Sequence, residues 1–168
     1  MRFHLEQPLP ASAEQVVDVL VDQAFLASLS ELPKLGRPEV LEQRVDGTTL
    51  RQRVRYRFTG NLSPAVTSVI DPKKLVWVDE TTYDRAAGTA SFRILPEHYA
   101  DRLKAGGTYR FLPTGPDTCT RVADGDLSVR FPFVGKAVER AIVAGLEEHI
   151  VAEAALVARW LEDHRGTR

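Results

Sequence analysis

The sequence predicts one α+β domain, in which a curved antiparallel sheet of seven or eight strands wraps around a long C-terminal helix, with two short helices after the first strand. Between Gly135 and His164 there is no proline and one internal glycine, which predicts a helix of about eight turns. Residues 40–131 mostly alternate between apolar and polar, which favours strands. Two short apolar stripes precede these strands and predict the short helices. A chain of 168 residues suits a single domain over residues 1–168.

The composition excludes several classes of function. Hydrophobic residues make up 43% and charged residues 27%, as in ordinary soluble proteins. A net charge of −1 gives no electrostatic argument for a nucleic-acid or membrane partner. No apolar run is long enough to cross a membrane, the beginning lacks the apolar segment of a signal peptide, and a lone cysteine, Cys119, suits a reducing compartment. We expect a cytoplasmic protein with no nucleic-acid partner and no stable membrane insertion.

The first elements are a strand and two short helices. Residues 2–9 alternate and end at a pair of prolines, which predicts a short strand. Ser12 and Gln15 have the spacing of a capping box, in which each side chain bonds the other residue's backbone N–H. An apolar stripe over residues 16–21 predicts a helix of about three turns. A second short helix is expected over residues 25–29, before Pro33.

A hairpin is expected next, because residues 40–45 and 48–58 flank Asp46-Gly47, a dipeptide suited to a type I′ turn. This turn would place Val45 opposite Thr48. In the second arm one face carries Leu50, Gln52, Val54, Tyr56 and Phe58, and the other carries Arg51, Arg53, Arg55 and Arg57. We therefore expect one buried face and one solvated arginine face, without a role in nucleic-acid binding.

The remaining strands are expected at residues 66–70, 75–84, 89–95, 108–112 and 118–131. Within 75–84, Trp77, Asp79, Thr81 and Tyr83 share one side. The tryptophan favours that side as the inward one, whereas valines 76 and 78 favour the other. Residues 124–126 (Asp-Gly-Asp) predict a β-bulge, and residues 96–107 fit either a helical turn or a folded loop.

The long helix carries an anomaly, because His149 and Glu153 lie in the middle of its apolar face. A buried carboxylate without a partner costs several kcal/mol. Glu153 therefore needs His149 on the preceding turn, a hydroxyl or guanidinium from a strand, or a cavity filled with water or ligand. A satisfied polar pair, a ligand-contacting pair and an acid–base pair are all open at this point.

Three segments carry a family resemblance: residues 92–96 (Phe-Arg-Ile-Leu-Pro), residues 132–139 (Pro-Phe-Val-Gly-Lys-Ala-Val-Glu) and the helix tail from Glu147 to Leu161. With the order of elements, they resemble the helix-grip fold of the START-like (SRPBCC) superfamily, and within it an actinobacterial START-like family of unknown function. The resemblance implies a hydrophobic cavity between sheet and long helix, with ligand access near the two short helices.

These observations predict a binder of a small, largely apolar molecule (a lipid, isoprenoid or polyketide-like compound) without a cofactor. The histidines lack metal-ligand spacing, so no metal site is expected. Two alternatives stay open: a cyclase- or aromatase-type enzyme with His149 or Glu153 as general base, and an interaction module with a vestigial cavity. Oligomeric state is not predicted. The residues predicted to line the cavity are Gln52, Val54, Tyr56, Trp77, Tyr83, Ile142, Leu146, His149, Glu153 and Trp160.

Overall fold

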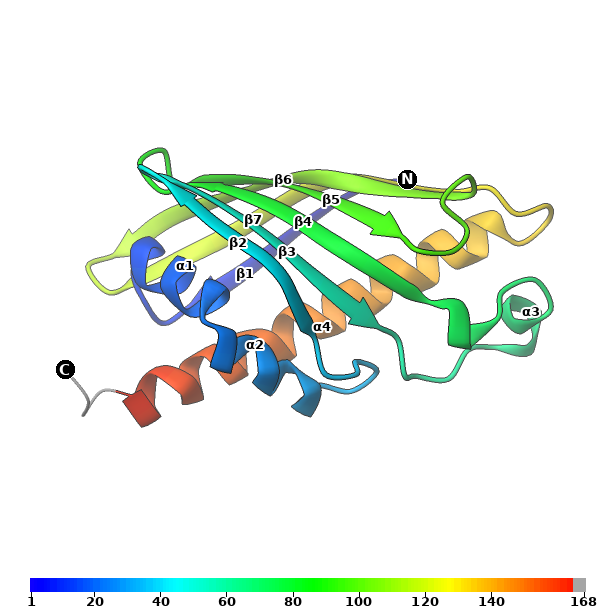
Figure 1. Ribbon diagram of the computed structural model, residues 1–168, viewed down its shortest axis with the longest axis horizontal. Helices are drawn as coiled ribbons and strands as arrows, with labels where there is room; N and C mark the ends of the chain where they lie inside the picture. The colour runs from blue at the N-terminus through cyan, green and yellow to red at the C-terminus, as the bar shows by residue number, and fades with distance from the viewer. Residues whose placement is uncertain (165–168) are drawn as a thin grey trace.

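The computed structural model describes residues 1–164 and contains one seven-stranded antiparallel sheet. Its strands follow one another in the order β1-β7-β6-β5-β4-β3-β2 (Figure 1). The predicted fold class and the lower of the two predicted strand numbers are thus confirmed. The strands are β1 (Arg2–Leu9), β2 (Glu39–Asp46), β3 (Thr49–Arg57), β4 (Val76–Asp84), β5 (Thr89–Pro96), β6 (Leu103–Gly115) and β7 (Thr118–Val129).

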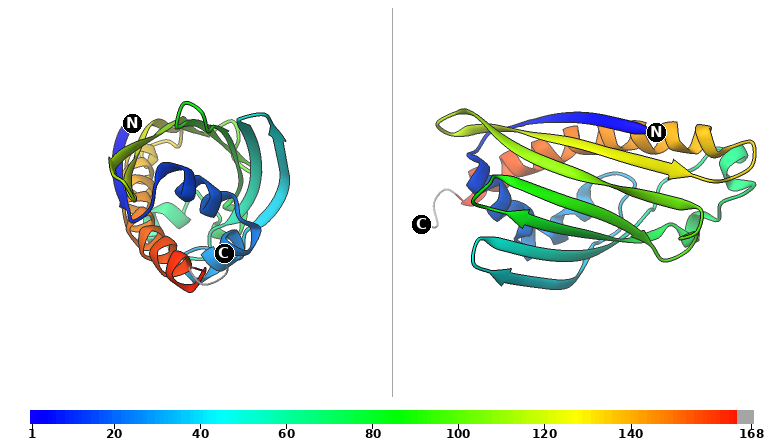
Figure 2. Two further views of the ribbon diagram at one scale, coloured as in Figure 1. Left: turned by 90° about the vertical axis from the view of Figure 1, so that its left-hand side faces the viewer. Right: turned by 90° about the horizontal axis from the view of Figure 1, so that it is seen from above.

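One long helix, α4 (Gly135–His164), runs along the sheet, and shorter helices lie at its ends. The sheet curves strongly, and α4 lies closest to β1 and β7 instead of over the sheet centre (Figure 2). The two short helices after β1 lie at one end of the curved sheet (Figure 2). The short elements are α1 (Ala13–Val21), α2 (Gln23–Ser28), α3 (Pro64–Thr67) and the 3-10 turns η1 (Leu29–Glu31) and η2 (Pro72–Lys74).

The capping signals fix where α1 and α2 begin. Ser12 and Gln15 form the predicted capping box, with both reciprocal hydrogen bonds present. The side chain of Asp22 accepts hydrogen bonds from the backbone of Ala24 and Phe25, and it thereby starts α2 directly after α1. The two predicted short helices are confirmed.

The hairpin has a different turn from the one that the sequence predicts. Gly47 and Thr48 are its central residues, and Val45 pairs with Leu50, so the predicted pairing of Val45 with Thr48 is wrong. Gly47 has a φ of 58°, whereas Thr48 is not among the residues with positive φ. A turn with glycine first needs positive φ only there, as in type II′. Because the register moves by two residues, the inward face of β3 is unchanged.

Two further predictions are wrong for local reasons. Residues 66–70 are not a strand: the helix α3 begins at Pro64, whose fixed φ suits the first turn of a helix. The predicted bulge at residues 124–126 is absent, since β7 pairs there in regular register with β1 and β6. Gly125 serves close packing instead, because a Cβ atom there would lie 2.4 Å from the ring of Phe3.

The ambiguous segments are also settled. Of residues 96–107, the last five belong to β6, and a loop of residues 97–102 precedes them. Trp77 pairs with Tyr56, and Asp79 pairs with Val54, so the tryptophan side of β4 faces inward. The valines at 76 and 78 are nevertheless buried, on the outer face. They lie opposite Arg57 and Arg55, and long arginine stems shield apolar neighbours from water.

The apolar interior divides into two clusters at opposite ends of the sheet. One cluster joins α1 and α2 to the C-terminal part of α4, around Phe25 and Val157. The other joins α3 to the N-terminal part of α4, around Leu127 and Val138. Leu146 and His149, from the middle of α4, belong to neither cluster of the described residues. The middle of the helix is therefore only half-buried.

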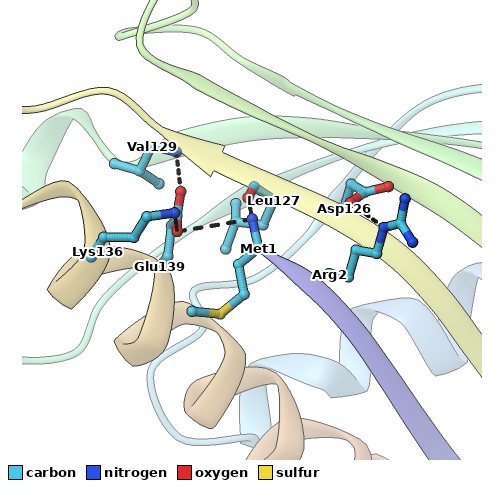
Figure 3. A network of polar contacts seen from close by, with 7 residues as sticks. All are labelled: Met1, Arg2, Asp126, Leu127, Val129, Lys136 and Glu139. Atoms are coloured by element: carbon cyan, nitrogen blue, oxygen red, sulfur yellow. Dashed lines mark hydrogen bonds and ion pairs between the residues drawn. The ribbon is translucent and has the colours of Figure 1, made fainter.

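Glu139 fixes the beginning of α4 to the sheet (Figure 3). Its buried carboxylate accepts a hydrogen bond from the backbone N–H of Val129 at 3.0 Å and pairs with Lys136 at 2.9 Å. The amino group of Met1 lies 3.9 Å from the same carboxylate. The hydrogen bonds from Val129 and Lys136 lower the pKa of Glu139. This carboxylate thus stabilises the junction between β7 and α4.

Glu139→Ala is expected to lower the free energy of unfolding by about 1–2 kcal/mol, because it leaves the N–H of Val129 buried without an acceptor. Chemical denaturation followed by circular dichroism measures the change. Glu147→Ala, an exposed site on the same helix, is the matched control and should change stability by less than about 0.5 kcal/mol. Equal effects of the two substitutions would contradict the stabilising role of Glu139 at the junction of β7 and α4.

Candidate functional site

Polar side chains gather on the concave face of the sheet. Directly paired residues of neighbouring strands share a face, so the pairs Tyr56↔Trp77 and Gln52↔Thr81 lie on the inward side with Val54. The pairs Tyr83↔Ala90 and Ala90↔Tyr109 continue this face across β5 to β6. The pair Gln7↔Arg121 extends it to β7 and β1. Polar and aromatic groups from five strands therefore face the same interior.

A buried ion pair joins this face to α4. The guanidinium of Arg121 pairs with the carboxylate of Glu153, and the two residues are 8% and 6% exposed. The side-chain amide of Gln7 donates a hydrogen bond to Glu153 at 3.2 Å and another to the backbone carbonyl of Ile150. Arg121 also lies over the ring of Tyr109, 5.1 Å from its centre. Glu153 is therefore satisfied by a strand guanidinium, one of the three solutions that the sequence allowed.

The ion pair determines the charge state of both partners. Burial alone would raise the pKa of Glu153, but Arg121 and His149, with the hydrogen bonds from Gln7 and Arg121, bring it below its ordinary value. Burial alone would lower the pKa of Arg121, and Glu153 outweighs this effect. Both groups stay charged near neutral pH, so Glu153 is a poor proton acceptor.

Among the ionisable groups of the concave face, Asp79 is the one whose pKa is shifted toward neutral pH. It is half-buried and accepts a hydrogen bond from the hydroxyl of Thr81 at 2.7 Å. Burial raises the pKa of Asp79 to about 6, against the opposite effects of Thr81 and Arg121. A carboxyl with this pKa is populated in both protonation states near neutral pH, which is what general acid–base chemistry requires.

Three tyrosines lie near this carboxyl, and the pKa of each is raised away from neutral pH. Burial, together with the charge of Asp79, raises the pKa of Tyr56 and Tyr109. Burial also raises the pKa of Tyr83, although Arg121 opposes it. All three phenols remain protonated near neutral pH, so they can donate hydrogen bonds to a carbonyl or carboxylate oxygen.

Aromatic rings stack in pairs along the same face. The rings of Tyr56 and Trp77 are 5.8 Å apart and 19° from parallel. The rings of Phe92 and Tyr109 are 4.5 Å apart and 22° from parallel. Such flat surfaces favour contact with planar or apolar molecules.

The structure divides the residues that the sequence predicted for the cavity. Trp77, Leu146 and His149 belong to neither apolar cluster, and Glu153 forms the ion pair with Arg121. Tyr83 is buried in the first cluster, and Tyr56 packs against that cluster. Gln52 is buried and bonds to Gln43 at 2.6 Å, and Val54 is fully buried in the first cluster. Ile142 packs in the second cluster, and Trp160 packs edge-on against Phe25 in the first. The predicted set is thus partly central and partly packed at the two ends.

Three residues of the site were not predicted from the sequence: Gln7, Arg121 and Tyr109. Gln7 and Arg121 occupy inward positions of strands whose other inward residues, such as Leu9 and Ala123, are apolar. A polar residue at an apolar position of an alternating strand was the available signal. This signal is weak when one strand is considered alone, because the partner of the polar side chain, Glu153, comes from α4.

Other features of the described chain lie apart from the concave face. A shallow groove of about 560 Å³ lies on the outer side of β4, β5 and β6, around Thr82, Ser91 and Thr108. Within residues 1–164, no group of three or more histidine, cysteine, aspartate or glutamate side chains is placed to hold a metal ion. None of the helices in this range is both long and apolar enough to span a membrane.

Comparison with known proteins gives one family and several structural neighbours. A family described as protein of unknown function (DUF2505) matches residues 4–161. The protein TTHA0849 from Thermus thermophilus superposes with a TM-score of 0.70 at 21% identity, covering 95% of this chain and 98% of that one. A search of curated protein sequences finds no match.

Two structural neighbours are enzymes by name. The Zhui aromatase/cyclase from a Streptomyces species has a TM-score of 0.67 at 19% identity, covering 98% of this chain and 96% of its own. Norcoclaurine synthase from Thalictrum flavum has a TM-score of 0.63 at 21% identity, covering 94% of this chain and 86% of its own. At these identities the likeness establishes the helix-grip fold and nothing about the role of this chain.

Proposed function

The chain belongs to the DUF2505 family of proteins of unknown function, and we propose that it binds a small, largely apolar molecule between the concave face of the sheet and α4. The single observation that carries this proposal is the division of the interior. Two packed clusters lie at the ends, and several half-buried residues belong to neither of them, among them Trp77, Asp79, Leu146 and His149.

Half-buried side chains on an inward face are unusual for a domain of this size. An interior is normally packed to the density of an organic crystal, which leaves inward residues inaccessible. Trp77, Asp79 and Tyr109 face inward and keep part of their surface accessible. A guest molecule between β4, β6 and α4 would cover this surface, and each fully covered large side chain contributes about 1.5–3 kcal/mol.

The chemistry of the lining describes the guest. Stacked aromatic pairs and aliphatic residues supply most of the surface, so the guest is largely apolar. Asp79, the phenols and the Arg121–Glu153 pair supply polar contacts for one end of the guest, such as a hydroxyl or a carbonyl. The residues that we propose to contact the guest are Tyr56, Trp77, Asp79, Tyr83, Tyr109, Arg121, Leu146, His149 and Glu153. Gln52, Val54, Ile142 and Trp160 would bound the space at its two ends.

The structural neighbours support a guest of this kind. Norcoclaurine synthase from Thalictrum flavum has been crystallised with dopamine and hydroxybenzaldehyde, which are small aromatic molecules. The Zhui protein and the di-domain BexL protein are named aromatase/cyclases. A fold shared with such proteins is compatible with a small guest at the corresponding place, and the residues of this chain determine which guest it is.

Ligand binding can be tested with a panel of fatty acids, isoprenoids and flat aromatic ketones. Native mass spectrometry reports the stoichiometry, and Trp77 fluorescence reports the place. A Trp160→Phe variant leaves Trp77 as the single tryptophan, because the chain has two. A one-to-one complex that quenches Trp77 supports the proposal. Failure of every compound to bind, together with an interior that excludes solvent in an experimental structure, would contradict it.

Filling the interior should abolish this binding. Ile94 lies on the concave face of β5, opposite Asp79, and Leu95 next to it faces outward. If the space is open, Ile94→Trp is expected to weaken ligand binding at least tenfold while the protein stays folded. Leu95→Trp is the matched control and should leave the ligand affinity unchanged. An Ile94→Trp protein that loses several kcal/mol of stability would show that the place is already filled, and would contradict the proposal.

A cyclase- or aromatase-type enzyme is the second candidate, and one observation favours it: burial raises the pKa of Asp79 to about 6 beside protonated phenols. Asp79 replaces Glu153 as the candidate base, because Arg121 holds Glu153 in its charged form. The test incubates a bound polyketide-like ketone with wild type, Asp79→Asn and His149→Ala. Product formation that Asp79→Asn abolishes without loss of binding supports an enzyme. Equal turnover in all three proteins would exclude both residues as the base.

A further inference from the structure

Phe133 is the most exposed large apolar side chain of the described residues, with 106% relative exposure. It lies in the link between β7 and α4, and its φ is 66°. Phenylalanine rarely adopts this left-handed conformation, because its Cβ atom approaches the following carbonyl oxygen. An exposed aromatic ring in a strained conformation gains nothing from its own fold. The feature therefore points to a contact outside this chain.

The link that presents Phe133 is held firmly. The backbone N–H of Gly135 donates a hydrogen bond to the carbonyl of Phe131 at 3.1 Å, and the N–H of Arg130 donates to the carbonyl of Arg102 at 2.7 Å. The guanidinium of Arg102 lies 5.3 Å from the ring centre of Phe131. Phe133 is thus projected from an ordered platform at one end of the molecule.

Three connections meet at this end, shown with α3 at the right of Figure 1: residues 58–75, 97–102 and 130–134, the last of which leads into the first turn of α4. The backbone N–H of Asp71 donates to the hydroxyl of Tyr99 at 3.0 Å, and the ring of Tyr99 packs edge-on against Phe131. These contacts join the three connections into one surface around Phe133. We call it the Phe133 end.

The charge of the Phe133 end differs from that of the rest of the molecule. Its five basic side chains are all exposed, and they outnumber three acidic ones: Lys73, Lys74, Arg102, Arg130 and Lys136 against Asp71, Glu97 and Asp101. Within this end Asp101 pairs with Arg102, and to neighbouring residues Glu97 pairs with Arg55 and Lys136 with buried Glu139. At the opposite end, α1 and η1 contain three acidic residues and no basic one, and two of these acids pair with arginines, Asp18 with Arg85 and Glu31 with Arg159. The net charge of −1 conceals this asymmetry.

We infer that the Phe133 end docks on the surface of anionic lipid bilayers. An exposed aromatic side chain surrounded by cations fits the boundary between head groups and acyl chains. Arg130, in the same link as Phe133, contacts anionic head groups, and the ring of Phe133 inserts beside it. The contact is peripheral, and it is independent of the proposed ligand on the concave face.

Flotation with large unilamellar vesicles tests this inference on the full chain, using phosphatidylcholine alone or with about 30% phosphatidylglycerol. Wild type is expected to bind the anionic vesicles at least tenfold more strongly than the neutral ones, and binding should weaken in high salt. Phe133→Ser should weaken binding about tenfold and Arg130→Gln about fivefold. Val151→Ser, at an exposed apolar site on α4, should bind as wild type does.

A second variant separates binding from folding. Glycine adopts positive φ without strain, so Phe133→Gly is expected to melt at or above the temperature of wild type while losing the same vesicle binding. Wild type that ignores anionic vesicles, or Phe133→Ser that binds like Val151→Ser, would overturn the inference. Self-association in sedimentation velocity that needs Phe133 would also overturn it, by assigning this end to a second copy of the chain.

Discussion

Replacing Arg121 with methionine is expected to lower the free energy of unfolding by about 3–5 kcal/mol, because Glu153 would be left as a buried charge without its partner. Methionine keeps most of the volume of the arginine side chain, so the loss reports the charge and not a cavity. Denaturant unfolding followed by circular dichroism measures it. Exposed Arg51, which shares Glu80 with two other arginines, is the matched control: Arg51→Met should cost less than about 1 kcal/mol.

Two further observations isolate the ion pair. The double variant Arg121→Met with Glu153→Leu should recover most of the lost stability, since a buried ion pair and an apolar pair of similar volume are about equally stable. The defect of Arg121→Met should also shrink as the pH is lowered, because burial without Arg121 raises the pKa of Glu153 and its carboxylate is neutralised more readily than in wild type. A single variant that matches Arg51→Met in stability would mean that Glu153 finds another partner.

Asp79→Asn is expected to stabilise the protein by about 2–3 kcal/mol near pH 8. Burial raises the pKa of Asp79 from 3.8 to about 6, so ionised Asp79 is less favourable in the folded state than in the unfolded state. Each unit of this difference corresponds to about 1.4 kcal/mol. Asparagine is neutral and of equal size, and it can still accept the hydrogen bond from Thr81.

The sign of the pH dependence follows from the same difference. Well below pH 3.8, Asp79 is protonated in both states, and the two proteins should be equally stable. As the pH rises through the range from 3.8 to about 6, wild type should lose stability relative to Asp79→Asn, and above it the gap should stay constant. Asp126→Asn, at an exposed site on the outer face, should show no such gap. A difference in stability between wild type and Asp79→Asn that grows toward low pH would contradict the raised pKa of Asp79.

Local signals in the sequence predicted most of the elements, and they were wrong where two local solutions competed. The capping box of Ser12 and Gln15 involves four consecutive residues, so it could be read directly. The turn after Asp46 allowed two registers, and the preference of Gly47 for positive φ is compatible with both. Residues 66–70 contain three apolar β-branched residues, as strands often do, but hydrogen bonds after Pro64 form a helical turn instead.

The candidate site was harder to predict, because its contacts are distant in sequence. The anomaly of Glu153 was visible on α4, and the need for a guanidinium or another partner followed from the cost of burial. Which arginine it would be depends on the pairing of β7 with β1, which places Arg121 beside Gln7 and under α4. The row of arginines on β3 was correctly expected to face outward, where carboxylates such as Glu80 pair with them.

The separation of the interior into two clusters couples the folding of the protein to the binding of the proposed guest. Each cluster ties one end of α4 to the sheet, and neither contains the central stretch around Leu146 and His149. A guest seated there would serve as part of the hydrophobic core, joining two halves that otherwise stand apart. Its concentration would then enter the folding equilibrium directly, so the protein would be most stable where its guest is abundant.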